Sequence, residues 1–153
     1  MRHFIYFLTA SLAFSTPAFA EITGSSPQYI AKLIGDAGYR AQMETSNDGA
    51  PRIRSAAEGV NFSIWFYGCK SSRGCNSIQF SAGFEMKDGM TLAKVNEWNR
   101  KKRFGKVYVN DDNNPFIQMD VNLDYGVTDK NFMDTFDYWQ VVLDSFNDFR
   151  TGK

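Results

Sequence analysis

The chain has 153 residues, which is enough for one domain and too few for two of ordinary size. Its 17 basic and 17 acidic side chains balance, so it lacks the basic excess of a nucleic-acid-binding protein, and no nucleic acid is expected as a partner. Hydrophobic residues make up 43% of the chain and aromatic residues 16%, which can supply a hydrophobic core at this size.

Residues 1–20 have the three parts of a secretory signal peptide: a positive start, an apolar stretch over residues 4–14, and the cleavage motif Ala18-Phe19-Ala20. The apolar stretch is too short to span a bilayer, which takes about 20 residues. We therefore expect cleavage after Ala20, one domain over residues 21–153 without a membrane span, and a periplasmic or secreted location. An uncleaved amphipathic leader is the alternative.

Cleavage would remove His3, which is the only histidine of the chain. Without an imidazole, catalysis by Ser-His-Asp or Cys-His groups is excluded, and so are metal sites that need histidine ligands. The sequence therefore predicts neither an enzyme nor a bound cofactor.

The first half of the expected mature chain predicts one helix followed by four strands. The helix covers residues 27–37, with Ser26 as its N-cap, Pro27 in its first turn and Gly38 as its stop. Alternating apolar and polar residues, or turn signals at both ends, indicate the strands: residues 39–44, 51–56, 61–67 and 77–86. The last two strands are expected to form an antiparallel hairpin.

The second half predicts a helix, two strands and a long C-terminal helix. Thr91 caps the helix over residues 92–104, whose apolar stripe is Leu92, Val95 and Trp98. Strands follow over residues 106–110 and 116–124. Thr128 and Asp129 begin the last helix, whose apolar residues recur at helical spacing: Phe132, Phe136, Trp139, Leu143 and Phe146.

The predicted order of elements is therefore α-ββββ-α-ββ-α. Several strands have one polar face, which indicates a sheet that is covered on one side only. The sequence predicts a two-layer α+β fold, with a mostly antiparallel sheet of five or six strands and three helices against its apolar face.

The stretch from Leu92 to Asp124 resembles the YbjN family, which is described as bacterial regulators of sensory transduction. The resemblance rests on Asn96-Glu97-Trp98-Asn99, on Arg103-Phe104 and on Met119-Asp120-Val121-Asn122-Leu123-Asp124. The aromatic C-terminal helix fits as well, so the resemblance covers residues 25–149. It implies a fold similar to class I type III secretion chaperones, small α+β proteins that often dimerise, and it implies no established catalytic residues. The signal peptide is a departure from the cytoplasmic members.

Cys69 and Cys75 are the only cysteines, and they flank the loop of the expected hairpin. Cross-strand neighbours satisfy the Cα separation of a disulfide, about 4.4–6.8 Å. An exported chain also meets oxidising conditions. A redox-active pair is the alternative, although the spacing is not C-x-x-C. We expect a structural disulfide that staples the hairpin.

Asp120, Asn122 and Asp124 alternate like the first ligands of a calcium-binding loop. An EF-hand needs glycine at the sixth position and glutamate at the twelfth, where this chain has Tyr125 and Asn131. The alternation of a half-buried strand explains the same spacing without a metal ion, so none is expected.

A basic cluster follows Trp98 and consists of Arg100, Lys101, Lys102, Arg103 and Lys106. It is either a docking patch for an acidic partner or a solvated helix end whose cations complement the helix dipole. The partner of such a patch would be nucleic acid, anionic lipid or an acidic protein. Export argues against nucleic acid, and an acidic protein is the main alternative to the solvated helix end.

Trp65, Tyr67 and Tyr108 are expected on the sheet face that points away from the helices. Exposed aromatic side chains that lie together are typical of a protein interface. Burial under a loop or a terminus is the alternative. If the face is open, a homodimer is the simplest way to cover it.

The leading hypothesis is an exported domain that binds a protein partner without catalysis. The alternatives are a small-ligand sensor that uses the sheet face, and a hydrolase built on Glu85, Asp120 and Asp124. A deep concave site with two or more acids would favour the hydrolase, whereas a flat aromatic sheet face would favour the protein partner.

Overall fold

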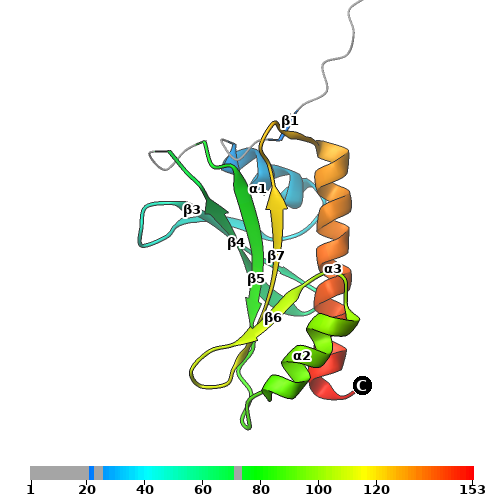
Figure 1. The fold of residues 1–153 in the computed structure, drawn as a ribbon. Coiled ribbons are helices and arrows are strands. Elements are labelled where there is room, and N and C mark those ends of the chain that lie inside the picture. Colours follow the sequence, from blue (N-terminus) through cyan, green and yellow to red (C-terminus); the bar gives the residue numbers. More distant parts are fainter. Residues whose placement is uncertain (1–20, 23–25, 71–73) are drawn as a thin grey trace, which may run out of the picture.

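The computed structural model describes residues 21–22, 26–70 and 74–153 (Figure 1). The signal peptide predicted over residues 1–20 lies outside the described residues. Within the described ranges, no helix is both long enough and apolar enough to cross a bilayer.

Six strands form one antiparallel sheet in the order β2-β3-β4-β5-β7-β6. Their bounds are β2 Ala41–Thr45, β3 Pro51–Ala57, β4 Val60–Tyr67, β5 Ser77–Gly83, β6 Lys106–Val109 and β7 Pro115–Asn122. The sequence analysis did not predict a second, two-stranded ladder, in which β1 (Glu21–Ile22) pairs with β8 (Val127–Thr128). This ladder lies beside the start of the last helix.

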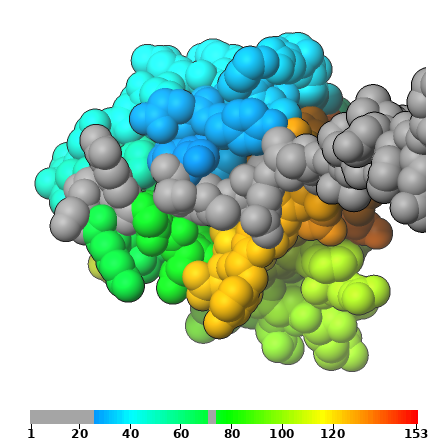
Figure 2. Space-filling view, turned by 90° about the horizontal axis from the view of Figure 1, so that it is seen from above, coloured from blue at the N-terminus to red at the C-terminus, as the bar shows by residue number. Residues whose placement is uncertain are grey.

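The helices α1 (Pro27–Asp36), α2 (Leu92–Lys101) and α3 (Asp129–Thr151) form the second layer. In Figure 1, α3 runs along the length of the sheet and α2 crosses its C-terminal half. Seen from above, α1 lies between the β2–β3 hairpin and the start of α3 (Figure 2). The predicted two-layer α+β fold is confirmed.

Strand alternation decides which side chains enter the core between the layers. In β4, Phe62, Ile64 and Phe66 are buried, whereas the residues between them face the other side of the sheet. Phe80 pairs with Ile64 across the strands and stacks on Trp139 of α3, with ring centroids 5.4 Å apart. The centre of the core is therefore aromatic and joins β4 and β5 to α3.

Two of the three predicted N-caps use their side chains as expected. The hydroxyl of Thr91 accepts from the Lys94 N–H at 3.3 Å, and that of Thr128 accepts from the Asn131 N–H at 3.2 Å. Ser26 occupies the N-cap position of α1 but makes no such side-chain hydrogen bond.

The strand predicted over residues 77–86 ends earlier, at Gly83. Its partner β7 begins at Pro115, which leaves no neighbouring strand for the last three residues. Only the Phe84 N–H continues the pattern, by donating to the Pro115 carbonyl at 3.0 Å. A strand ends where its partner ends, whatever its own alternation.

The helix predicted over residues 92–104 ends at Lys101, and Leu92 does not belong to its buried side. Leu92 is 72% exposed, and Trp98 is the one buried residue of α2. The reason is that α2 meets the core through Trp98, where it crosses α3, and in part through Val95, while its first turn lies at the end of the molecule (Figure 1).

Candidate protein-binding surfaces

Trp98 fixes the connection between α2 and β6. Its indole Nε1–H donates to the Gly105 carbonyl at 2.6 Å, and its ring meets the edge of Phe146 with centroids 5.0 Å apart. Gly105 has a φ of +81°, and a Cβ there would lie 2.7 Å from a Val142 methyl group. The connection therefore requires glycine at this position.

Asn99 holds the outer edge of β6. Its side-chain amide donates to the Val107 carbonyl at 2.9 Å and accepts from the Val107 N–H at 2.8 Å. Both backbone groups would otherwise be exposed at the edge of the sheet. Two residues that carry the family resemblance, Trp98 and Asn99, therefore act in folding.

Two of the three alternating polar residues at the end of β7, Asp120 and Asn122, have hydrogen-bond partners within the protein. Asp120 accepts a hydrogen bond from the Gln79 side chain at 2.8 Å, and Asn122 accepts one from the Asp124 N–H at 3.0 Å. Across the described ranges, no group of three acidic, histidine or cysteine side chains is placed to hold a metal ion. Asp120 and Asn122 lie in β7, where successive side chains alternate between the two faces, whereas Asp124 follows the strand.

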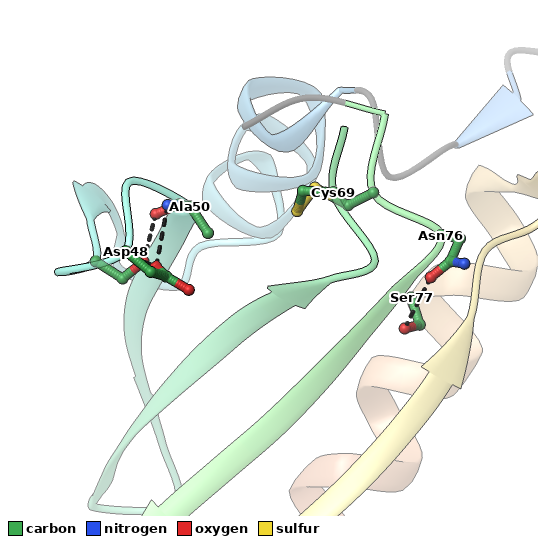
Figure 3. The surroundings of a disulfide bond; sticks show 7 residues. Asp48, Ala50, Cys69, Asn76 and Ser77 are labelled. Atoms are coloured by element: carbon green, nitrogen blue, oxygen red, sulfur yellow. Dashed lines mark hydrogen bonds between the residues drawn. A yellow bond between two sulfur atoms is a disulfide. The ribbon is translucent and has the colours of Figure 1, made fainter. Parts of the chain in front are cut away.

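The predicted disulfide joins Cys69 and Cys75 across the β4–β5 connection (Figure 3). Beside it, the Asn76 N–H donates to the Tyr67 carbonyl at 3.1 Å. The bond therefore closes the end of the hairpin, where Tyr67 lies on the outer face of the sheet.

Trp65, Tyr67 and Tyr108 lie on the sheet face away from the helices, as the alternation predicts. Tyr67 is 47% exposed and Tyr108 is 38% exposed. Trp65 is half-buried because the guanidinium carbon of Arg52 lies 4.8 Å from its ring centroid. We call this side of the sheet the open face.

The sequence analysis missed Phe116, which belongs to the open face. Its ring stacks on that of Tyr108, with centroids 5.3 Å apart and an interplanar angle of 16°. A Cβ at Gly83 would lie 2.5 Å from the Phe116 ring, so the glycine makes room for it. The alternation of β7 was the available signal, because it places Phe116 on the same side as Gln118.

A chain of polar groups crosses the middle of the open face. The Tyr67 hydroxyl donates to the side-chain oxygen Oε1 of Gln79 at 3.4 Å. The side-chain nitrogen Nε2 of Gln79 in turn donates to the Asp120 carboxylate. Burial and the nearby charge of Asp120 raise the pKa of Tyr67. The hydroxyl therefore stays protonated and keeps its hydrogen bond to Gln79 over a wider pH range.

At the β2–β3 edge of the open face, the pairing of the two strands brings two arginines close to one glutamate. Arg52 lies opposite Glu44 in the β2–β3 register and binds its carboxylate, while Arg54 approaches the same carboxylate at 3.5 Å. The hydrogen bond from Arg52, together with the charges of both arginines, lowers the pKa of Glu44. One carboxylate is thus shared by two cations.

The basic cluster lies on the other side of the molecule from the open face, except for Lys106 in β6. Lys101 pairs with Glu97 at 2.6 Å, and the Lys102 ammonium lies 5.3 Å from the Trp98 ring centroid. Arg103 lies over the Phe104 ring at 5.0 Å. The fold therefore does not bring the two predicted surfaces together.

The three acids of the hydrolase hypothesis lie far apart. Glu85 follows the end of the β5–β7 ladder at Gly83, whereas Asp124 follows the opposite end at Asn122. Six residues of strand separate these ends, which is about 20 Å. A different set of acids, Glu58, Asp137 and Asp144, lines a surface hollow of about 370 Å³ beside α3. The sequence analysis missed it because Glu58 is distant in the chain.

No curated protein and no solved structure matches the chain. The expected likeness to class I type III secretion chaperones therefore has no matching structure to support it. A family model, YbjN, described as "Putative bacterial sensory transduction regulator", matches residues 26–149. This range includes all six strands of the large sheet, both surfaces and nearly all of α3. The chain belongs to the YbjN family.

Proposed function

We propose that this chain is an exported domain of the YbjN family that binds a protein partner through its open face and acts without catalysis. The main support for this proposal is that the described helices all pack on the opposite face of the sheet. The open face is left with four aromatic side chains: Trp65, Tyr67, Tyr108 and Phe116. Aromatic residues and arginine are enriched in protein interfaces.

The charges around these rings favour a partner with acidic groups at the rim of an apolar surface. Arg52 and Arg54 share the single carboxylate of Glu44, and Lys106 stands exposed on the opposite edge strand. Asp120 already accepts a hydrogen bond from Gln79. Arg52, Arg54 and Lys106 are therefore cations of the rim that acidic groups of a partner would complement, although Asp48 also lies beside Arg52 and Trp65.

A small-ligand sensor is the second candidate, since the open face has a hollow of about 210 Å³ between Trp65 and Phe116. Pockets for small ligands usually enclose about 300–1,000 Å³. The floor of this hollow is formed by Ser63 and Ser81, and it lies on a sheet surface rather than between elements. Its size and position support a protein partner more than an enclosed ligand.

Site-specific photocrosslinking in the cell envelope tests the proposal. A photoreactive phenylalanine analogue replaces Tyr67, Tyr108 or, as the matched control, Tyr125, which is exposed in the turn after β7. We expect one protein to be captured from positions 67 and 108 and not from position 125. The purified partner should then lose affinity at least about tenfold for the variant with Tyr67→Ala and Tyr108→Ala, as expected for central aromatic contacts.

Two outcomes would overturn the proposal. Equal capture from Tyr125 would mean that the open face is not the binding surface. Crosslinks between two copies of the chain at position 67 or 108 would mean that the open face pairs with itself, which is the homodimer considered from the sequence.

A further inference from the structure

The side of α3 that faces away from the sheet is acidic. Five exposed residues share this side at helical spacing: Asp134, Asp137, Val141, Asp144 and Asp148. None of these aspartates makes a salt bridge with another described residue. Two of them and Glu58 line the hollow of about 370 Å³, to which Val141 and Gln140 also contribute. Such a hollow suits a cationic side chain with an aliphatic stem.

The basic cluster lies on the opposite flank of α3, at the same level along the helix. The Phe104 ring, which follows Arg103, contacts Tyr138 with centroids 5.1 Å apart. Tyr138 and Gln140 are two residues apart, so they point about 200° apart around the helix. Tyr138 therefore marks the basic flank and Gln140 the acidic flank. Val141 is 64% exposed and lies on the outward side of α3 between the two flanks, with Tyr138, 49% exposed, on its basic side. Asp134 and Asp148 lie about two turns from Val141 along the helix, and we call this line of residues the ridge.

We propose that this surface binds a second copy of the chain around a twofold axis parallel to α3. A rotation about that axis exchanges the two flanks, so the basic cluster of each copy meets the acidic hollow of the other. An axis perpendicular to α3 would instead place basic against basic and acidic against acidic. Both contacts of the parallel arrangement are complementary, and the assembly closes at two copies.

The ridge supplies the apolar centre of the contact. The exposed rings of Phe104 and Tyr138 and the side chain of Val141 lie there. Asp134 and Asp148 are each seven residues from Val141, about 10 Å along the helix, and each would face its own copy across the axis, a repulsion that the complementary contacts on both flanks must exceed. The proposal goes beyond partner binding on the open face and leaves that face accessible.

Charge reversal with complementation tests the proposal by light scattering and sedimentation. The basic variant carries Arg100→Glu and Arg103→Glu, and the acidic variant carries Asp137→Lys and Asp144→Lys. Each variant alone places like charges at both contacts, so we expect its dimer dissociation constant to rise at least about tenfold. A mixture of the two variants restores opposite charges at both contacts, and so does one chain with all four changes. Both should dimerise like the original chain.

Salt provides an independent measurement. The original dimer should weaken between about 0.02 M and about 0.5 M salt, because the Debye length falls from about 20 Å to about 4 Å. Tyr67→Ala with Tyr108→Ala should leave the dimer unchanged, which separates this surface from the open face. A monomeric original chain at high concentration, or a mixture that fails to restore the dimer while both variants are folded by circular dichroism, would overturn the proposal.

Discussion

At the scale of single residues, Asn99 and Trp98 show how a family signature can report folding rather than binding. Both side chains bind backbone groups of the connection between α2 and β6. The neighbouring Asn96 is exposed on the same helix. Mutations can therefore separate the residues of the signature that stabilise the fold from those that do not.

Asn99→Ala should lower the free energy of unfolding by about 1–3 kcal/mol, because it removes two hydrogen bonds to the backbone of Val107 that contribute about 0.5–1.5 kcal/mol each. The matched change Asn96→Ala, at an exposed position of the same helix, should stay within about 0.5 kcal/mol. Urea denaturation followed by tryptophan fluorescence measures both. Equal effects would contradict the structural role of Asn99.

Gly105→Ala should destabilise the protein more than Gly38→Ala. Both glycines have positive φ, +81° and +91°, so both substitutions carry the backbone penalty, about 1 kcal/mol or more. Only at Gly105 would the new Cβ also meet Val142 and Ile117; the space around Gly38 is empty. Thermal unfolding of the two variants isolates this steric difference, and equal shifts in melting temperature would argue against it.

At the scale of elements, the β2–β3 pair makes the stability depend on pH through Glu44. Its pKa is lowered in the folded state below the unfolded value, about 4.3. The ion pair's contribution is therefore complete above about pH 4.3 and is lost as the pH falls through the lowered pKa. The stability difference between the original chain and Glu44→Gln should thus be largest near neutral pH and shrink in acid. Urea unfolding at several pH values checks this, and a constant difference would refute it.

The β4–β5 hairpin depends on its disulfide for stability and not for its shape. Replacing both Cys69 and Cys75 by serine should lower the free energy of unfolding by about 2.4 kcal/mol, from the entropy of closing a seven-residue loop. The strand pairing from Ser63 to Tyr67 remains, so the circular dichroism spectrum should keep its form. Loss of the folded spectrum would mean that the disulfide is essential to the fold.

At the scale of the whole molecule, the core that joins the two layers carries the stability. Phe80 stacks on Trp139 and lies near Phe136, so Phe80→Ala removes contacts of β5 with α3. We expect a cost of about 3–5 kcal/mol, a large part of the 5–15 kcal/mol, roughly, that stabilises a domain of this size. The matched surface change Val141→Ala should have little effect on the monomer. Denaturant midpoints at low protein concentration compare the two variants.

The two proposed surfaces lie on opposite sides of the molecule. The open face carries Tyr67 and Tyr108, whereas the ridge of α3 carries Tyr138 and Val141 beyond the helix layer. A dimer formed through α3 would therefore present two open faces outward. Partner binding and self-association can then be removed separately by mutation.

Strand alternation and helical spacing were sufficient to predict the order of strands and helices along the chain, but not the order of the strands within the sheet. They also placed Trp65, Tyr67 and Tyr108 on one face, because successive side chains of a strand point to opposite sides. The errors came where an element depends on its neighbours. The strand predicted over residues 77–86 is shorter because β7 begins at Pro115, and Leu92 is exposed because α2 contacts the core through Val95 and Trp98 and not through its first turn.

The sequence by itself determined the two-layer fold, the cysteine pair and the N-caps at Thr91 and Thr128, because each depends on residues close in the chain or on a simple period. Only the tertiary structure decided which surfaces these elements build. The pairing of Arg52 and Arg54 with Glu44 depends on the β2–β3 register. The hollow that joins Glu58 to Asp137 and Asp144 depends on the packing of α3 against a distant turn. Local patterns specify elements, whereas contacts between residues far apart in the chain form only when those elements pack.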